Sequence, residues 1–262
     1  MNERVIILNK QFFIIGILLI AIVTVTIINF VSKNIPKEVE IKQNFSHVDV
    51  ETDNSDIIFI ASKDEQAKVV LENSNSKYQL NANVKGETLE VDIEHKWFKL
   101  ISFNFFSKTP TLVIYLPEHI YGTITAESAN GIIEANDLVA KEISVETNNG
   151  EVDLSNLKVS SLFVESDNGE IILENIEGTI VGESSNGDIS LVNDTINQSV
   201  NLDTNNGTIS VKAKEKPKNV TIEVETNNGH ISVLGNSNAK TVLGNGKELI
   251  KLKSNNGSIF VE

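Results

Sequence analysis

Hydrophobic and polar residues alternate with a period of two through most of the chain after about residue 45. The stretches HVDVETDNSDIIFIA (47–61), ETLEVDIE (87–94) and TLVIYLP (111–117) are examples, bounded by Asn, Asp, Ser, Gly or Pro. Alternation of this kind is typical of β-strands with one buried face. Beyond the N-terminal segment, no stretch repeats its apolar residues at a helical period over three turns. The pattern therefore predicts an all-β fold.

One phrase, a short polar turn between two alternating stretches, recurs along the second half of the chain. It reads SVETNNGEVDL at 144–154 and NLDTNNGTISV at 201–211, with the dipeptide Asn-Gly at its centre. The glycines of successive Asn-Gly dipeptides are 19, 19, 18, 20, 22 and 28 residues apart. This spacing indicates an internal repeat with one insertion near its end. The seven predicted turn glycines are Gly131, Gly150, Gly169, Gly187, Gly207, Gly229 and Gly257.

Two architectures produce such a repeat. Asn-Gly is a preferred two-residue turn of β-hairpins, and pairing of Thr147 with Val152 would place apolar residues on one face. In a β-solenoid, each coil instead contributes two short strands, and the turns stack above one another. A near-constant period favours the solenoid, because each coil must lie on its neighbour. Stacked Asn side chains would then share amide hydrogen bonds, and glycine would supply a left-handed backbone at the bend.

We therefore expect a parallel β-helix, or β-solenoid, with coils of about 19 residues around an apolar interior. Residues 122–262 hold the Asn-Gly coils, and residues 45–121 form a less regular part in which Asn54 and Ser55 stand where Asn-Gly would be. The chain stops on the strand-like SIFVE (258–262), which predicts an open C-terminal edge that invites self-association. The predicted inward residues are Ile143, Val145, Val152, Leu154, Leu162, Val164, Ile171 and Leu173.

An apolar run without charge, FFIIGILLIAIVTVTIINFV (12–31), precedes these strands. A helix of that length spans roughly the 30 Å hydrocarbon layer. Cleaved signal peptides have shorter apolar cores and a small-x-small site, so we predict an uncleaved signal anchor. Lys and Arg are equally frequent on both flanks; the short basic head and the acidic bulk favour a cytoplasmic N-terminus. The predicted segments are a cytoplasmic stub (1–11), a transmembrane helix (12–31), a tether (32–44) and an extracytoplasmic domain (45–262).

The charge and the cysteine content exclude several functional classes. The net charge is −14, and a surface this acidic repels nucleic acid. Arg4 is the only arginine, so the folded part has no guanidinium for two-point recognition of phosphate or carboxylate. Cysteine is absent, which rules out disulfides, thiolate nucleophiles and zinc-thiolate sites.

No catalytic residue, cofactor or metal site is predicted, and we do not expect an enzyme. The four histidines, His47, His95, His119 and His230, show no ligand spacing. Carboxylates at Asp53, Asp56, Asp167, Glu170 and Asp188 lie in predicted turns and could offer oxygen ligands to calcium. Because the acids are missing from the TNNGTI and TNNGHI repeats, we interpret these segments as structural turns.

The segment HKWFKLISFNFFSK (95–108) concentrates aromatic residues beside lysines. These aromatics either close the core at the bottom of the solenoid or contact the membrane or a partner protein, since aromatic and basic residues suit a membrane interface. The candidate contact residues are Trp97, Phe98, Phe103, Phe105 and Phe106.

In three features, taken in order, the sequence resembles the LiaG-like adhesin family. These are VDVETDNSDIIFI (48–60), an apolar strand that ends in proline at 111–117, and the train of Asn-Gly units that begins at ESANGIIEA (127–135). The resemblance covers nearly the whole chain after the membrane segment. The family is common in low-G+C Gram-positive bacteria and often encoded with cell-envelope stress systems. It implies a β-helical fold and an attachment role, and no catalytic residues.

Repetition creates a long regular surface rather than a pocket, so we expect a membrane-anchored binding or scaffold module of the cell envelope. Its partner would be an envelope protein or a cell-surface ligand. The alternative is an accessory subunit that modulates a membrane-embedded envelope-stress sensor through its helix and aromatic segment.

Overall fold

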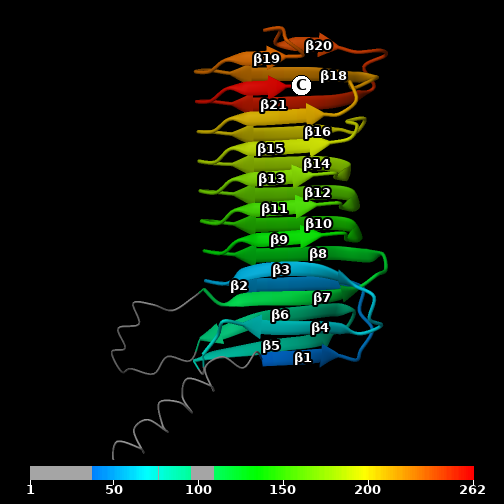
Figure 1. Ribbon diagram of the computed structural model, residues 1–262, viewed down its shortest axis with the longest axis vertical. Helices are drawn as coiled ribbons and strands as arrows, with labels where there is room; N and C mark the ends of the chain where they lie inside the picture. Colours follow the sequence, from blue (N-terminus) through cyan, green and yellow to red (C-terminus); the bar gives the residue numbers. More distant parts are fainter. Residues whose placement is uncertain (1–36, 76, 96–108) are drawn as a thin grey trace, which may run out of the picture.

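The computed structural model describes residues 37–75, 77–95 and 109–262, and these residues form an upright stack of 22 β-strands (Figure 1). Nothing in this part of the chain is helical, which confirms the all-β prediction there. It accordingly holds no helix of the length and apolarity needed to cross a bilayer. The predicted transmembrane segment, residues 12–31, lies outside the described residues.

Each regular coil contributes one strand to each of two parallel sheets. Val145 pairs with Val164 of the next coil, and Leu154 pairs with Leu173. This parallel, in-register pairing confirms the solenoid and excludes hairpins at the Asn-Gly turns. The strands of these coils are β8 (Tyr121–Ser128), β9 (Ile133–Asn136), β10 (Val139–Thr147), β11 (Val152–Ser155), β12 (Lys158–Ser166), β13 (Ile171–Glu174), β14 (Glu177–Ser184), β15 (Ile189–Asn193), β16 (Val200–Thr204) and β17 (Ile209–Ala213).

The part of the chain before β8 mixes parallel and antiparallel pairs. Two of its strands, β2 and β3, build a first coil that lies under β8 and β9. β4 pairs antiparallel with β1 and β7, and β5 pairs antiparallel with β6. β1 lies within the segment predicted as a tether, 32–44, so the folded part already includes residues before 45. The strands are β1 (Lys37–Ile41), β2 (His47–Thr52), β3 (Asp56–Ser62), β4 (Ala67–Glu72), β5 (Tyr78–Lys85), β6 (Thr88–His95) and β7 (Thr111–Pro117).

One continuous apolar core fills the space between the two sheets. All eight residues predicted to face inward are buried, with exposed fractions of 2% or less. A second, short corner follows β9, β11 and β13, where Leu138, Leu157 and Ile176 close the side of the core. Burial of this continuous core is the main source of stability in a chain without disulfides.

The coils do not stack in sequence order at the C-terminal end. Five strands complete this end: β18 (Val220–Thr226), β19 (Ile231–Val233), β20 (Lys240–Val242), β21 (Glu248–Ser254) and β22 (Ile259–Val261). Sheet A has the order β1-β4-β7-β3-β9-β11-β13-β15-β17-β22-β19, and sheet B has the order β20-β18-β21-β16-β14-β12-β10-β8-β2-β6-β5. The last coil of the chain, β21 and β22, therefore lies between the coil of β16 and β17 and the coil of β18 and β19.

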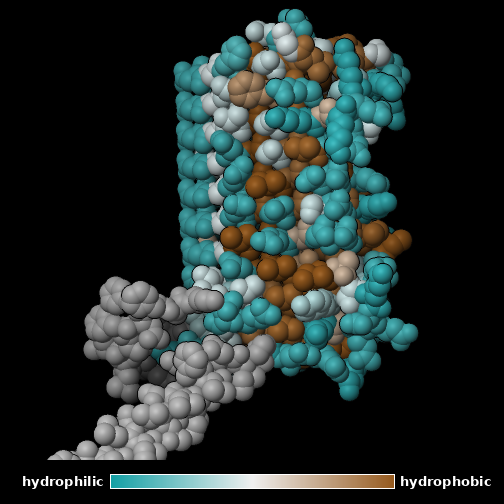
Figure 2. Space-filling model, in the orientation of Figure 1, coloured by the Kyte–Doolittle hydropathy of each residue, from teal (hydrophilic) through white to brown (hydrophobic). Residues whose placement is uncertain are grey.

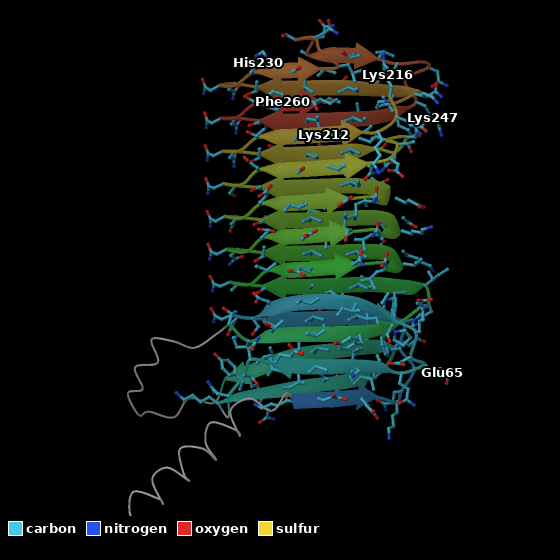
Figure 3. The ribbon with its side chains drawn as sticks, viewed as in Figure 1. Glu65, Lys212, Lys216, His230, Lys247 and Phe260 are labelled. Carbon is cyan, nitrogen blue, oxygen red and sulfur yellow. The ribbon has the colours of Figure 1, made fainter. Side chains whose placement is uncertain are left out.

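The prediction of an open edge at the C-terminus was therefore wrong. β22 has a neighbour on each side, because Phe260 pairs with Ser210 and with Ser232. Figure 3 shows Phe260 below His230 and above Lys212. The open edges at this end belong to β19 and β20, both only three residues long.

Engineered disulfides should report this order, because the natural chain has no cysteine. Neighbouring strands lie about 4.8 Å apart, within the Cα separation that a disulfide needs, whereas strands two apart lie beyond it. The pair Ser210→Cys and Phe260→Cys should oxidise readily, and the pair Ser210→Cys and Ser232→Cys should stay reduced. Gel mobility after mild oxidation measures both. Efficient linkage of the second pair alone would mean that the coils follow the sequence order.

The expectation of a left-handed backbone at the Asn-Gly glycines was also wrong. None of the seven has a positive φ. Left-handed residues lie instead at the opposite corner, where Asp137, Asn156 and Asn175 have φ of 59°, 54° and 53°. The Asn-Gly glycines meet a different requirement: a Cβ on Gly150 would collide with the backbone carbonyl of Gly131 in the coil below. Glycine is needed there because the backbones approach closely.

Candidate functional site

Asparagine side chains form a ladder along the edge of the stack that carries the Asn-Gly turns. Asn149 Nδ2 donates to Asn130 Oδ1 at 2.8 Å, and Asn168 Nδ2 donates to Asn149 Oδ1 at 2.9 Å. The turns make a continuous teal column at the left edge of Figure 2. Each inner amide has one partner above and one below, so the ladder fixes the coil register. In stacking order it comprises Asn54, Asn130, Asn149, Asn168, Asn186, Asn206, Asn256 and Asn228.

A column of buried hydroxyl groups lies just inside this ladder. Ser166 Oγ donates to the carbonyl oxygen of Gly150 at 3.0 Å, and Thr147 Oγ1 donates to that of Gly131 at 3.2 Å. This column was not predicted from the sequence, although Ser or Thr stands three residues before each turn glycine. Ser184 breaks the pattern, because its buried hydroxyl has no hydrogen-bond partner.

This difference predicts opposite outcomes for two similar substitutions. Ser166→Ala should lower the free energy of unfolding by about 1 kcal/mol, because a buried hydrogen bond is lost. Ser184→Ala should leave stability unchanged or raise it, because it removes a desolvated hydroxyl that makes no bond. Urea denaturation followed by circular dichroism compares the two. Equal losses would show that the Ser184 hydroxyl has a partner in solution.

The outer face of sheet B carries seven carboxylates in one straight row, which we call the acidic row. Glu146 is in register with Glu127 on one side and with Glu165 on the other. Neighbours in register lie on strands about 4.8 Å apart, so the charges repeat at that interval. In stacking order the acidic row comprises Asp92, Glu51, Glu127, Glu146, Glu165, Glu183 and Asp203. The next residue in register is Lys253, whose Nζ lies 3.6 Å from Asp203 Oδ2.

The acidic row shifts the protonation of its members. Partial burial, followed by repulsion from Glu146 and Glu51, raises the pKa of Glu127 above its ordinary value. Partial burial, followed by repulsion from Glu146 and Glu183, raises the pKa of Glu165. The signal in the sequence was an acid one residue before the Ser or Thr of every repeat except the last, as in ETDNS, ESANG and ESDNG.

These shifts predict that mild acidification stabilises the protein. A carboxyl whose pKa is raised by folding binds more protons in the folded state, so stability rises as pH falls through the folded pKa toward the ordinary 4.5. Glu223 acts in the opposite sense, since its hydrogen bond from Lys240 lowers its pKa, but that contribution is lost only below 4.5. Thermal melts should therefore give a higher midpoint near pH 5 than near pH 8. The double variant Glu127→Gln/Glu165→Gln should reduce this gain, and a midpoint that falls on acidification would contradict the prediction.

A hollow of about 380 Å³ opens on the outer face of sheet A, where β3 meets β9 and β11. A second hollow, of about 330 Å³, lies around the corner between β7 and β8. Both are lined by Ala61 and Asp137, so they adjoin, and we call the two together the junction groove. Its apolar lining includes Ile58, Ile60, Pro117 and Ile120, and its charged lining includes Glu118, Glu134, Asp137 and Asp153.

The other candidate residues of the sequence analysis do not converge on one site. Trp97, Phe98, Phe103, Phe105 and Phe106 lie outside the described residues. Within 37–75, 77–95 and 109–262, the structure brings together no group of three or more acidic or histidine side chains that could hold a metal ion.

Three of the five turn carboxylates accept hydrogen bonds from neighbouring coils instead. Asp56 Oδ1 accepts a hydrogen bond from the backbone N–H of Ile132, and Asp188 Oδ1 accepts one from that of Thr208. Asp167 Oδ1 accepts one from the hydroxyl of Ser185. These carboxylates therefore tie adjacent coils together.

Two long sheets wound from repeated coils, with polar ladders outside and one apolar core, define the protein as a β-solenoid. The model of the Toastrack DUF4097 family matches residues 45–262, so the chain belongs to this family. Comparison with curated protein sequences gives no significant match.

The solved structures that are similar to this chain have low sequence identity to it. A protein named "putative adhesin" from Bacteroides fragilis is 14% identical with a TM-score of 0.52, over 88% of this chain and 99% of that one. A "putative cell adhesion protein" from Clostridium sporogenes is 17% identical with a TM-score of 0.42, over 87% and 99%. A "putative lipid binding protein" from Parabacteroides distasonis is 15% identical with a TM-score of 0.38, over 87% and 96%. At these identities the likeness concerns the fold alone.

Proposed function

We propose that this chain is a binding or scaffold module of the cell envelope, a LiaG-like adhesin held at the outer surface of the cell membrane by residues 12–31. The acidic row is the observation that carries the proposal. Seven carboxylates at a constant interval on a flat sheet form a linear surface suited to an extended cationic partner. The adhesin role is taken from the name of the Bacteroides fragilis protein. We propose no catalysis and no cofactor, and we expect the partner to be an envelope protein or a cell-surface ligand.

Binding of polylysine to the full-length protein in lipid nanodiscs tests the role of the acidic row. The affinity should fall about tenfold or more between low and physiological salt, because exposed charges are screened. The triple variant Glu127→Gln/Glu146→Gln/Glu165→Gln should weaken binding at low salt by a similar factor. A matched control, Glu151→Gln/Glu170→Gln/Glu174→Gln, removes the same charge from outside the row and should have a small effect. Equal losses in both variants, or an affinity that ignores salt, would refute the proposal.

Protease accessibility on intact cells tests the proposed location. A tag at the C-terminus should be cleaved from outside in whole cells, and a tag before residue 12 should be cleaved only after lysis. Cell fractionation should place the uncut chain with the membrane. A chain recovered without its first 31 residues would show a cleaved signal peptide instead of an anchor.

The second candidate function is an accessory subunit of a membrane-embedded sensor, and the junction groove favours it. This groove lies in the β1–β9 end of the stack, the part nearest in sequence to residues 12–31. Replacing residues 12–31 by an unrelated membrane helix separates the two functions. A scaffold should keep its activity in the cell, whereas a sensor subunit should lose it.

A further inference from the structure

We propose that the junction groove binds an extended peptide segment that carries apolar side chains next to lysine or arginine. The inference rests on the proposed binding role and adds a second contact surface, on sheet A, to the acidic row on sheet B. The occupant is assigned from the shape, polarity and charge of the groove.

The groove exists because the strands beneath it are longer than those above it. The last residue of β3 that pairs with β9 is Ile60, opposite Asn136. β9 then ends, and the chain turns at Asp137 with a φ of 59°. β3 continues beside β7 through Ala61 and Ser62. The end of β3 therefore forms a ledge beyond the regular coils, and the segment between β7 and β8 forms a wall beside it.

The surface of this ledge is apolar. Ile60 is 38% exposed and Ile120 is 69% exposed, although both are large hydrophobic side chains. Beside Ile60, the outer face of β3 carries Ile58, which is half-buried. In Figure 2, brown side chains run up the centre of the visible face and include the level of β3 and β7. Contiguous exposed apolar surface of this kind marks interaction sites.

The carboxylates that line the groove make it acidic. Glu118, Glu134, Asp137 and Asp153 line it, and no lysine is among its lining residues. Partial burial, followed by repulsion from Asp153 and Asp56, raises the pKa of Glu134. Among the described residues, none of the four lining carboxylates takes part in an ion pair. A cationic side chain bound here would relieve this repulsion while apolar neighbours cover the two isoleucines.

The shape favours a peptide over a small molecule. The two hollows are shallow and follow each other around a corner, so a ligand that fills both must be elongated. An extended segment places alternate side chains on opposite sides, so it can offer apolar groups to the ledge and a cation to the acidic wall.

The test compares two short synthetic peptides with equal charge, one of alternating leucine and lysine and one of alternating serine and lysine. Fluorescence anisotropy measures their affinities for the full-length protein in detergent micelles. The leucine peptide should bind about tenfold more tightly, because only it can cover the exposed isoleucines. Ile60→Ser/Ile120→Ser should abolish this difference, and Glu134→Gln/Asp137→Asn should weaken the leucine peptide about fivefold. Asparagine is compatible with the backbone at 137, since Asn156 and Asn175 occupy the equivalent turns.

Controls separate this groove from the acidic row and from other occupants. Glu146→Gln/Glu165→Gln should weaken both peptides equally and leave the leucine preference intact; loss of the preference there would overturn the proposal. If the row variants do not affect polylysine binding but the leucine preference is retained, only the proposed role of the acidic row is refuted.

A wild-type dimer that Ile60→Ser/Ile120→Ser converts to monomer would assign the groove to a second copy of the chain. A tenfold gain in peptide affinity after removal of residues 96–108 would assign it to the chain itself. Either result, or equal binding of the two peptides, would overturn the inference.

Discussion

Gly169→Ala should destabilise the solenoid by about 3 kcal/mol, a large effect for the addition of one methyl group. The new Cβ would collide with the carbonyl oxygen of Gly150 and lie 2.5 Å from its carbonyl carbon. These are backbone atoms of a stacked turn, so no side-chain rotation relieves the clash. Separating the two coils would stretch the Asn149–Asn168 bond and the Ser166 hydroxyl bond together.

Gly235→Ala is the matched control for this substitution. Gly235 has a φ of 78°, and a Cβ there would meet no atom within 4 Å. Its replacement should cost only the left-handed strain of an alanine, about 1 kcal/mol. Thermal and urea unfolding of the two variants gives the comparison. If Gly235→Ala proved the more damaging, backbone conformation rather than close approach would explain why glycine recurs in the chain.

The double variant Lys251→Glu/Lys253→Glu should lose about 1–2 kcal/mol of stability at low salt. Lys253 lies in register between Asp203 below and Glu225 above, and Lys251 lies below Glu223. Reversing both charges would set like charges directly opposite one another at three residue pairs, one between β16 and β21 and two between β18 and β21. The loss should shrink in high salt and near pH 4.5, where screening and protonation remove the repulsion.

Lys141→Glu/Lys216→Glu changes the net charge by the same amount away from β21 and serves as its control. Both lysines are exposed. Chemical denaturation at two salt concentrations separates the variants. A salt-independent loss in the β21 variant, or an equal loss in the control, would show that the effect is not due to repulsion across these strands.

Lys251 and Lys253 of β21 also give a physical reason for the unexpected order of the coils. If β18 lay directly on β16, Glu225 would face Asp203, since both are in register with Lys253. Insertion of β21 places lysines between two acidic strands and removes that repulsion. The sequence contains this information, but it appears only when strand neighbours are known. The repeated phrase does not determine whether β18 or β21 lies next to β16, because both strands carry the same alternation and the same Asn-Gly turn.

The sequence by itself determined the unit of this fold. Alternation fixed which residues face the core, as Val145 and Leu154 show, and the spacing of Asn-Gly fixed the coil length. Asn54 and Ser55 were recognisable as a degenerate turn because their surroundings match those of the later repeats. These features are local, so one copy of the phrase is enough to specify them.

Only the tertiary structure decided how the units combine. The register of sheet B aligned separate carboxylates into the acidic row, and the unequal lengths of β3 and β9 opened the junction groove. Close contact between stacked backbones, not a left-handed turn, required glycine at Gly169. The stacking order of the last coils depended on charges from strands far apart in the chain. All of these features depend on which coils are neighbours in the stack. A sequence phrase that every coil shares cannot specify which coil lies next to which.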